Sequence, residues 1–238
     1  MNIELQIGSL MGIIPAIIVL YFIWGKFEGF FKDKLLFFHF VLGIVLGAII
    51  GVVYLILIFI EGYNIETSIL ILVILFALFT EMLKFIILNR PKYHNAYDTT
   101  YYGFAMGLGM GAMWISTLMT RKLTENPAAM SDPYTYIFYL CLSFSGIMIH
   151  SSTGAILGYG IANFKRKWAI TFSLTIQAIF NIILLLILTF ADFEGIGVIV
   201  TVIYSFLILY HIVYNDLLIN TLPQNLRKKL IRKVVKDE

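Results

Sequence analysis

The stretch that decides the fold is LLFFHFVLGIVLGAIIGVVYLILIFI, residues 35–60, which contains no Asp, Glu, Lys or Arg. An apolar run of this length reaches across the hydrocarbon core of a bilayer, which needs roughly 20 helical residues to span about 30 Å. Lipid offers no partner to backbone N–H and C=O groups, so the run is expected to close its own hydrogen bonds as a helix. This segment alone predicts an integral-membrane protein.

Six further apolar blocks flank this stretch. They predict spans at residues 8–24, 67–89, 101–119, 135–163, 168–190 and 196–215, followed by a basic tail at 216–238. Of the 238 residues, 60% are hydrophobic, and the mean hydropathy of +0.90 lies outside the range of soluble domains. The sequence therefore predicts a single all-α domain over residues 1–238, a polytopic membrane bundle of seven transmembrane helices.

The distribution of basic residues predicts the orientation of this bundle. Fourteen of the 17 Lys and Arg residues lie within 26–34, 90–92, 165–167 and 227–236, which fall on one side of the membrane. Only Arg121 and Lys122 are expected on the other side. Because basic loops stay in the cytoplasm, we expect the N-terminus outside and the C-terminus inside. The basic tail is interpreted as an anchor of this topology, with specific lipid recognition as the alternative.

The uneven distribution of basic residues also bears on where the protein is located and on what it binds. The net charge of +3 follows from topology, so nucleic acid is not an expected partner. The plasma membrane of a prokaryote is the expected location. The expected partners are the lipid bilayer and the transmembrane helices of a partner or substrate membrane protein.

Glycines recur at four-residue spacing in three of the expected spans. They are Gly43, Gly47 and Gly51 in the second, Gly103, Gly107 and Gly111 in the fourth, and Gly154 and Gly158 in the fifth. This spacing leaves a groove on one face of a helix, along which another backbone can approach closely. One interpretation is packing within the bundle, and the other is docking of a foreign transmembrane helix.

Ionisable side chains at bilayer depth cost roughly 2.5–3.5 kcal/mol each, so each of them needs a reason. Glu81 and Lys84 lie three residues apart on one helical face and can form an ion pair, or Glu81 can act as a general base. His150 lies in the middle of a span, as either a hydrogen-bonded core residue or a catalytic one. Asp98 falls at a cytoplasmic boundary.

Two further histidines, His39 and His211, lie near the ends of their spans. Both are expected to reach the membrane interface.

Polar landmarks recur in an order that resembles a known family. They are PA at 15–16, TEMLK at 80–84, DTTYYGFAMGLG at 98–109, His150 with GYG at 158–160, and QAIFN at 177–181. Together they resemble the PrsW family of intramembrane proteases, in the superfamily of CAAX-processing and Abi proteins. The resemblance implies an intramembrane protease fold with Glu81, His150, Lys84 and Asp98 as its catalytic candidates.

The chain departs from this family pattern at three positions. Thr80, Trp114 and Gln177 stand where the family has a glutamate, a second glutamate and a second histidine. A hydrolytic zinc site normally has three protein ligands, and Glu81 with His150 supplies at most two. Zinc would be under-liganded, so no cofactor is expected. Trp114 is also expected to fill and dry the space in which water would attack.

A second resemblance, to the anterior-pharynx-defective scaffold subunit of γ-secretase, rests on the glycine repeat of residues 103–111. The resemblance also includes His150, the aromatic segment 132–136 and the basic-Trp turn at 165–168. The chain departs from it at Gln177. The resemblance implies a scaffold that holds a protease and hydrolyses nothing itself.

The sequence is therefore compatible with three functions. The favoured interpretation is a non-hydrolytic scaffold, or holder of transmembrane partners, with a degenerate protease site. The alternative is an active, atypical intramembrane endopeptidase that uses Glu81 and His150. A transporter comes third, because the sequence contains no internal repeat of the kind that transporters often have.

Overall fold

The computed structural model describes residues 3–59, 65–130, 132–189 and 194–237, and this part of the chain is helical and contains no β-strand. The long helices are α1 (Ile3–Phe27), α2 (Asp33–Phe59), α3 (Ile65–Leu88), α4 (Thr99–Glu125), α5 (Pro133–Ala162), α6 (Arg166–Thr189) and α7 (Glu194–Leu207). A π-helical segment, η4 (Ile208–Leu217), leads from α7 to the short α8 (Leu218–Asn220) and then to α9 (Gln224–Asp237). Two 3₁₀ turns, η1 (Pro91–Tyr93) and η2 (Pro127–Met130), lie in the connections on either side of α4.

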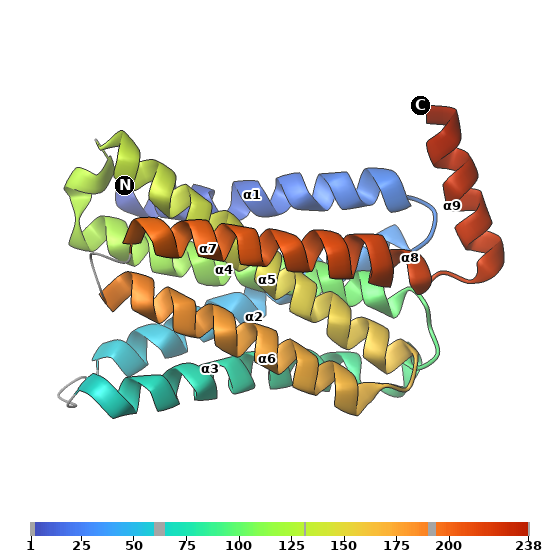
Figure 1. Cartoon of the computed structure of the whole chain (residues 1–238), viewed down its shortest axis with the longest axis horizontal. Helices are drawn as coiled ribbons and strands as arrows, with labels where there is room; N and C mark the ends of the chain where they lie inside the picture. Colours follow the sequence, from blue (N-terminus) through green and yellow to red (C-terminus); the bar gives the residue numbers. More distant parts are fainter. Residues whose placement is uncertain (1–2, 60–64, 131, 190–193, 238) are drawn as a thin grey trace.

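Six helices in the described ranges are long and apolar enough to cross a membrane. They are Gln6–Phe27, Asp33–Tyr54, Leu70–Leu88, Pro133–Ala162, Arg166–Ile187 and Gly195–Asn220. In Figure 1 α1 to α7 run side by side as one bundle. Length and composition therefore indicate a multi-pass integral-membrane protein.

The expected span at 101–119 forms α4, but this helix is not among the six, and its place in the bundle explains why. It packs against α5, α2 and α1, and nearly all of its residues between Thr99 and Leu123 are buried. A helix enclosed by other helices needs no aliphatic side chains facing lipid. It is instead rich in Gly and Thr, which lowers its hydropathy.

The repeated glycines are the contact points of this central helix. A Cβ on Gly43 or Gly47 would overlap the carbonyl oxygen of Met106 or Met110, so α2 lies directly on α4. The α4–α5 contact is equally close, because a Cβ on Gly103 would overlap the carbonyl oxygen of Gly154. The other four, Gly51, Gly107, Gly111 and Gly158, also face these two contacts. The structure thus supports packing within the bundle, and these grooves are not open to a foreign helix.

The helix α1 contains Pro15, whose ring removes a backbone N–H from the middle of a membrane span. The carbonyl oxygen of Met11, one turn earlier, loses its usual intrahelical donor. The Ser143 hydroxyl of α5 donates to this oxygen, and Ser143 is fully buried. A neighbouring helix thereby satisfies the freed carbonyl, as lipid could not.

The start of α5 is set by Asp132, whose carboxylate accepts hydrogen bonds from the backbone N–H groups of Tyr134 and Thr135. The Thr135 hydroxyl donates to it as well. These bonds, those of Thr135 first, hold the pKa of the Asp132 carboxyl below its usual range. An N-cap of this kind defines where a helix begins.

Candidate functional site

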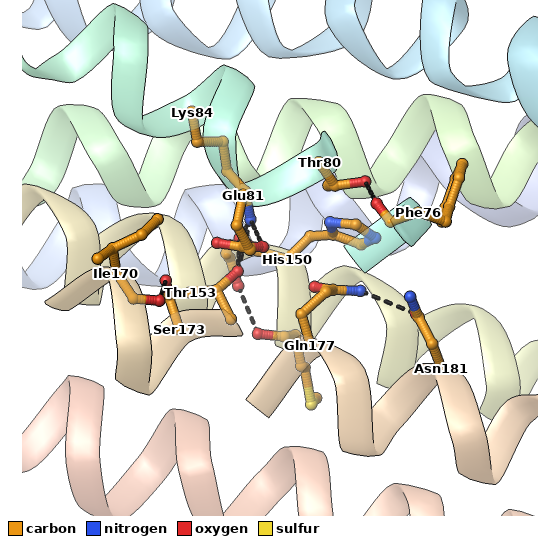
Figure 2. A network of polar contacts seen from close by, with 12 residues as sticks. Phe76, Thr80, Glu81, Lys84, His150, Thr153, Ile170, Ser173, Gln177 and Asn181 are labelled. Carbon is orange, nitrogen blue, oxygen red and sulfur yellow. Dashed lines mark hydrogen bonds and ion pairs between the residues drawn. The ribbon is translucent and has the colours of Figure 1, made fainter. Parts of the chain in front are cut away.

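The charged part of the candidate site is the ion pair between Glu81 and Lys84 on α3 (Figure 2). The Lys84 Nζ lies 2.5 Å from Glu81 Oε1, and both side chains are 0% exposed. The same ammonium donates to the Thr153 hydroxyl on α5 at 2.5 Å and lies 3.5 Å from the backbone carbonyl oxygen of His150. The structure therefore contains the ion pair expected from the spacing, and it links this pair to α5.

His150 lies next to this pair but makes a different set of contacts. Its side chain is 0% exposed, and neither ring nitrogen has a hydrogen-bond partner among the described residues. Its backbone lies against Gly107 and Gly111 of α4, where a side chain would collide with it. A buried polar group without a partner typically costs about 1–3 kcal/mol. The glycine contact thus holds an unsatisfied imidazole in the core.

The third side of the cluster comes from α6. Gln177 Nε2 donates to Asn181 Oδ1 at 3.0 Å, and Asn181 Nδ2 lies 3.5 Å from the carbonyl oxygen of Val73 on α3. Gln177 Oε1, like the imidazole, is buried and makes no described hydrogen bond. The Ser173 hydroxyl lies one turn before Gln177 and borders the Glu81 carboxyl. Figure 2 shows these α6 residues on the same polar cluster as Glu81 and His150.

Trp114 of α4 closes the cluster on another side. Its ring centroid lies 5.3 Å from that of His150, and its side chain is 2% exposed. The same ring packs against Phe76 at 6.1 Å and Tyr54 at 6.3 Å. The indole N–H is buried and has no partner among the described groups. An apolar ring therefore covers the imidazole at the position where the family pattern has a carboxylate.

A cavity of about 70 Å³ lies against the outer side of Trp114. It is lined by Tyr54, Leu72, Val73, Phe76, Trp114, Asn181, Leu184 and Leu185, which belong to α2, α3, α4 and α6. This lining is largely apolar, and neither Glu81 nor His150 belongs to it. The cavity thus borders Trp114 and Asn181 but not the charged pair.

Asp98, the fourth catalytic candidate, lies apart from the other three. It precedes α4 and is half-buried, and the Tyr102 hydroxyl donates to its carboxylate at 2.8 Å. Nine residues of helix separate it from Gly107, which touches His150, a rise of about 13 Å. The structure therefore brings together Glu81, Lys84 and His150 and leaves Asp98 at the end of the bundle.

His39 corrects an expectation from the sequence. It does not reach the membrane interface but is 0% exposed. Its Nδ1 lies 2.6 Å from the carbonyl oxygen of Leu35 and its Nε2 lies 2.7 Å from the Tyr93 hydroxyl. Its ring stacks on Tyr102 at 5.0 Å. Tyr93 and Tyr102 come from η1 and α4, so hydropathy along α2 could not reveal them. His211, by contrast, is exposed.

The side chains that could serve as ligands limit which metal ions the site can bind. Glu81 and His150 are the two side chains that could ligate a cation, and the ammonium of Lys84 already occupies one Glu81 oxygen. Within the described residues no group of three His, Cys, Asp or Glu side chains lies close enough to hold a metal ion. A hydrolytic zinc site normally takes three protein ligands. The residues present do not fit such a site.

Comparisons with protein-family models, with curated proteins and with solved structures found no match to this chain.

Proposed function

We propose that this chain is a PrsW-like scaffold of a prokaryotic plasma membrane, which holds the transmembrane helices of a membrane-protein partner and does not hydrolyse them. The observation that carries this proposal is that side chains of the bundle already occupy the polar cluster. Lys84 pairs with the Glu81 carboxylate at 2.5 Å, and Trp114 covers His150 at 5.3 Å.

The argument against hydrolysis is chemical. A general base must reach the water that it activates, and Glu81 is already bound by Lys84 at 2.5 Å. Trp114 occupies the volume beside His150 in which water would stand. A second acid–base group, which contributes roughly 10²–10⁴ in rate, is replaced by Gln177 and Thr80. The cluster is better suited to hold α3, α4, α5 and α6 together.

The proposed topology has seven spans, with the N-terminus outside and the C-terminus in the cytoplasm. α4 is the seventh span, since its 27 residues rise about 40 Å. Its neighbours α1, α2 and α5 shield its polar composition from lipid. Basic residues at one end of the bundle support the orientation.

The partner is proposed to bind the outward face of the bundle, because the glycine grooves are filled from within. Large apolar side chains cover this face, among them Ile71, Ile74 and Leu75 of α3, which are 44–55% exposed. An apolar helix can pack on such a surface through van der Waals contact.

An active endopeptidase is the alternative, and one observation favours it. Both ring nitrogens of His150 have no partner in the described structure, and the 70 Å³ cavity lies on the other side of Trp114. A rotation of this indole would connect the cavity to the imidazole. Glu81 would then act as base and His150 would stabilise an oxyanion.

The experiment is affinity purification from native membranes in mild detergent, followed by mass spectrometry. Wild type is compared with Glu81→Gln and with Glu125→Gln, a matched change at an exposed ion pair. A stoichiometric membrane partner retained by all three forms is the expected result. A single-pass protein enriched on Glu81→Gln alone would be a trapped substrate and would favour the endopeptidase.

A further inference from the structure

The last helix, α9, combines six basic and five apolar side chains within 14 residues. Helical periodicity places positions 226, 230 and 234 on one face, and all three are apolar. Three of the basic positions, Lys228, Arg232 and Lys236, fall on the opposite side. The helix is about 21 Å long, too short to cross a bilayer. This pattern is typical of helices that lie in the membrane interface.

The structure sets α9 at the end of the bundle and across its axis. Figure 1 shows it turning away from α7 and α8 and extending past the end of α1. Leu222 and Leu230 are 2% and 3% exposed, so the first turns are packed on the bundle. Arg227 Nη2 donates to the carbonyl oxygen of Asn220 at 3.1 Å and thereby braces the bend at Pro223. The start of α9 is therefore fastened to the end of the bundle.

Basic residues from the other connections gather at the same end. This is the end where α1, α3, α5 and α7 lead out and α2, α4 and α6 begin. It carries Lys26, Lys32, Lys34, Arg90, Lys92, Lys165, Arg166 and Lys167. The ion pairs of the described side chains are those of Glu81 with Lys84 and of Glu125 with Arg121 and Lys122, all elsewhere. Basic residues at this end therefore outnumber the carboxylates of Glu28, Asp33, Asp98 and Asp216 that lie among them.

Aromatic side chains place this end at the level of lipid headgroups. Phe164 and Trp168 are 65% and 44% exposed. They border a hollow of about 490 Å³ together with Lys165, Arg166 and Lys167. Exposed aromatic rings beside basic residues are characteristic of the membrane–water interface.

We propose that α9 and these basic loops form a surface that binds the anionic phosphate headgroups of the lipid leaflet at this end. The apolar stripe of α9 holds the helix against the bundle, where Leu230 is 3% exposed, and its basic side contacts the phosphates. The inference does not depend on the scaffold function, because it uses no residue of the polar cluster.

The test uses the full chain with a single label on α9. Cys141 is the only cysteine, so Cys141→Ser with Asn225→Cys accepts an environment-sensitive fluorophore at one exposed position beside the basic residues of α9. The protein is reconstituted in nanodiscs of phosphatidylcholine alone, or of phosphatidylcholine mixed with phosphatidylglycerol. We expect a blue-shifted emission with phosphatidylglycerol that is absent or much smaller with phosphatidylcholine alone. The difference should shrink as salt is raised, since the Debye length falls to about 3 Å at 1 M.

Two variants decide the origin of this shift. Lys228→Gln combined with Lys229→Gln and Arg232→Gln should abolish the response to phosphatidylglycerol. Arg121→Gln with Lys122→Gln, at the opposite end of the bundle, should leave it unchanged. Equal emission in both lipid mixtures would overturn the proposal, as would an equal loss in the two variants.

Discussion

Two buried histidines lie in different regions of the bundle, and their surroundings differ. His39 on α2 and His150 on α5 are both 0% exposed. The ring nitrogens of His39 bond to Tyr93 and Leu35, whereas those of His150 have no described partner. A core imidazole that is fully bonded stabilises the fold, and one that is not costs stability. The contrast indicates that the His39 region serves structure and that the His150 region is the one available for another use.

The largest expected loss of stability comes from breaking the ion pair of Glu81 and Lys84, which lies in the His150 region and has no counterpart near His39. Lys84→Met would leave the Glu81 carboxylate buried without its ammonium, which is expected to cost about 3–5 kcal/mol of stability. The protein should accumulate poorly, and its Tm in detergent should fall sharply.

Adding Glu81→Gln to Lys84→Met removes the remaining charge. We expect this double variant to recover most of the lost Tm. If it stays as unstable as Lys84→Met alone, the loss comes from packing, and the charge pair does not set the two regions apart.

A smaller effect is expected from the contact that holds His150 in place. Gly107→Ala would push a methyl group into the carbonyl oxygen of His150, an overpacking that is expected to cost about 1–3 kcal/mol. Gly25→Ala is the matched control on α1, because a Cβ there has no atom within 4 Å. Thermal unfolding of both variants in the same detergent should show a clear loss only for Gly107→Ala.

The direct comparison of the two histidines has the smallest expected difference. His39→Phe leaves the Tyr93 hydroxyl and the Leu35 carbonyl without their partner, so about 1–3 kcal/mol should be lost. His150→Phe makes the same change of ring but removes two unpartnered nitrogens, so its cost should be smaller than that of His39→Phe. Equal losses of Tm would mean that the His150 nitrogens are satisfied in the membrane, and the contrast would disappear.

Part of the candidate site followed from spacing alone. The ion pair of Glu81 and Lys84 was predicted because residues three apart share a helical face. Its third partner, Thr153, lies 69 residues away on α5, and no local pattern indicates which helix α3 will meet. The sequence also could not predict that the ring nitrogens of His150 lack hydrogen-bond partners. This depends on the packing of Trp114 and on the absence of a described donor or acceptor from the neighbouring helices.

The fold, like the site, was predictable from the sequence only in part. The expected span at 135–163 became α5 (Pro133–Ala162) and that at 168–190 became α6 (Arg166–Thr189), so helix positions were predicted closely. The basic tail expected at 216–238 contains α9. Its short apolar stripe at positions 226, 230 and 234 is readable in the sequence beside the charge run.

What the sequence determined by itself is that the chain forms membrane-embedded helices, because hydropathy and backbone hydrogen bonding act within single segments. The tertiary structure alone decided that α4 is the central helix, that the glycine grooves are filled from inside, and that His39 and His150 have opposite surroundings. In lipid no hydrophobic force selects one helix neighbour over another. Close backbone contacts and polar partners make this selection, and both depend on residues far apart in the chain.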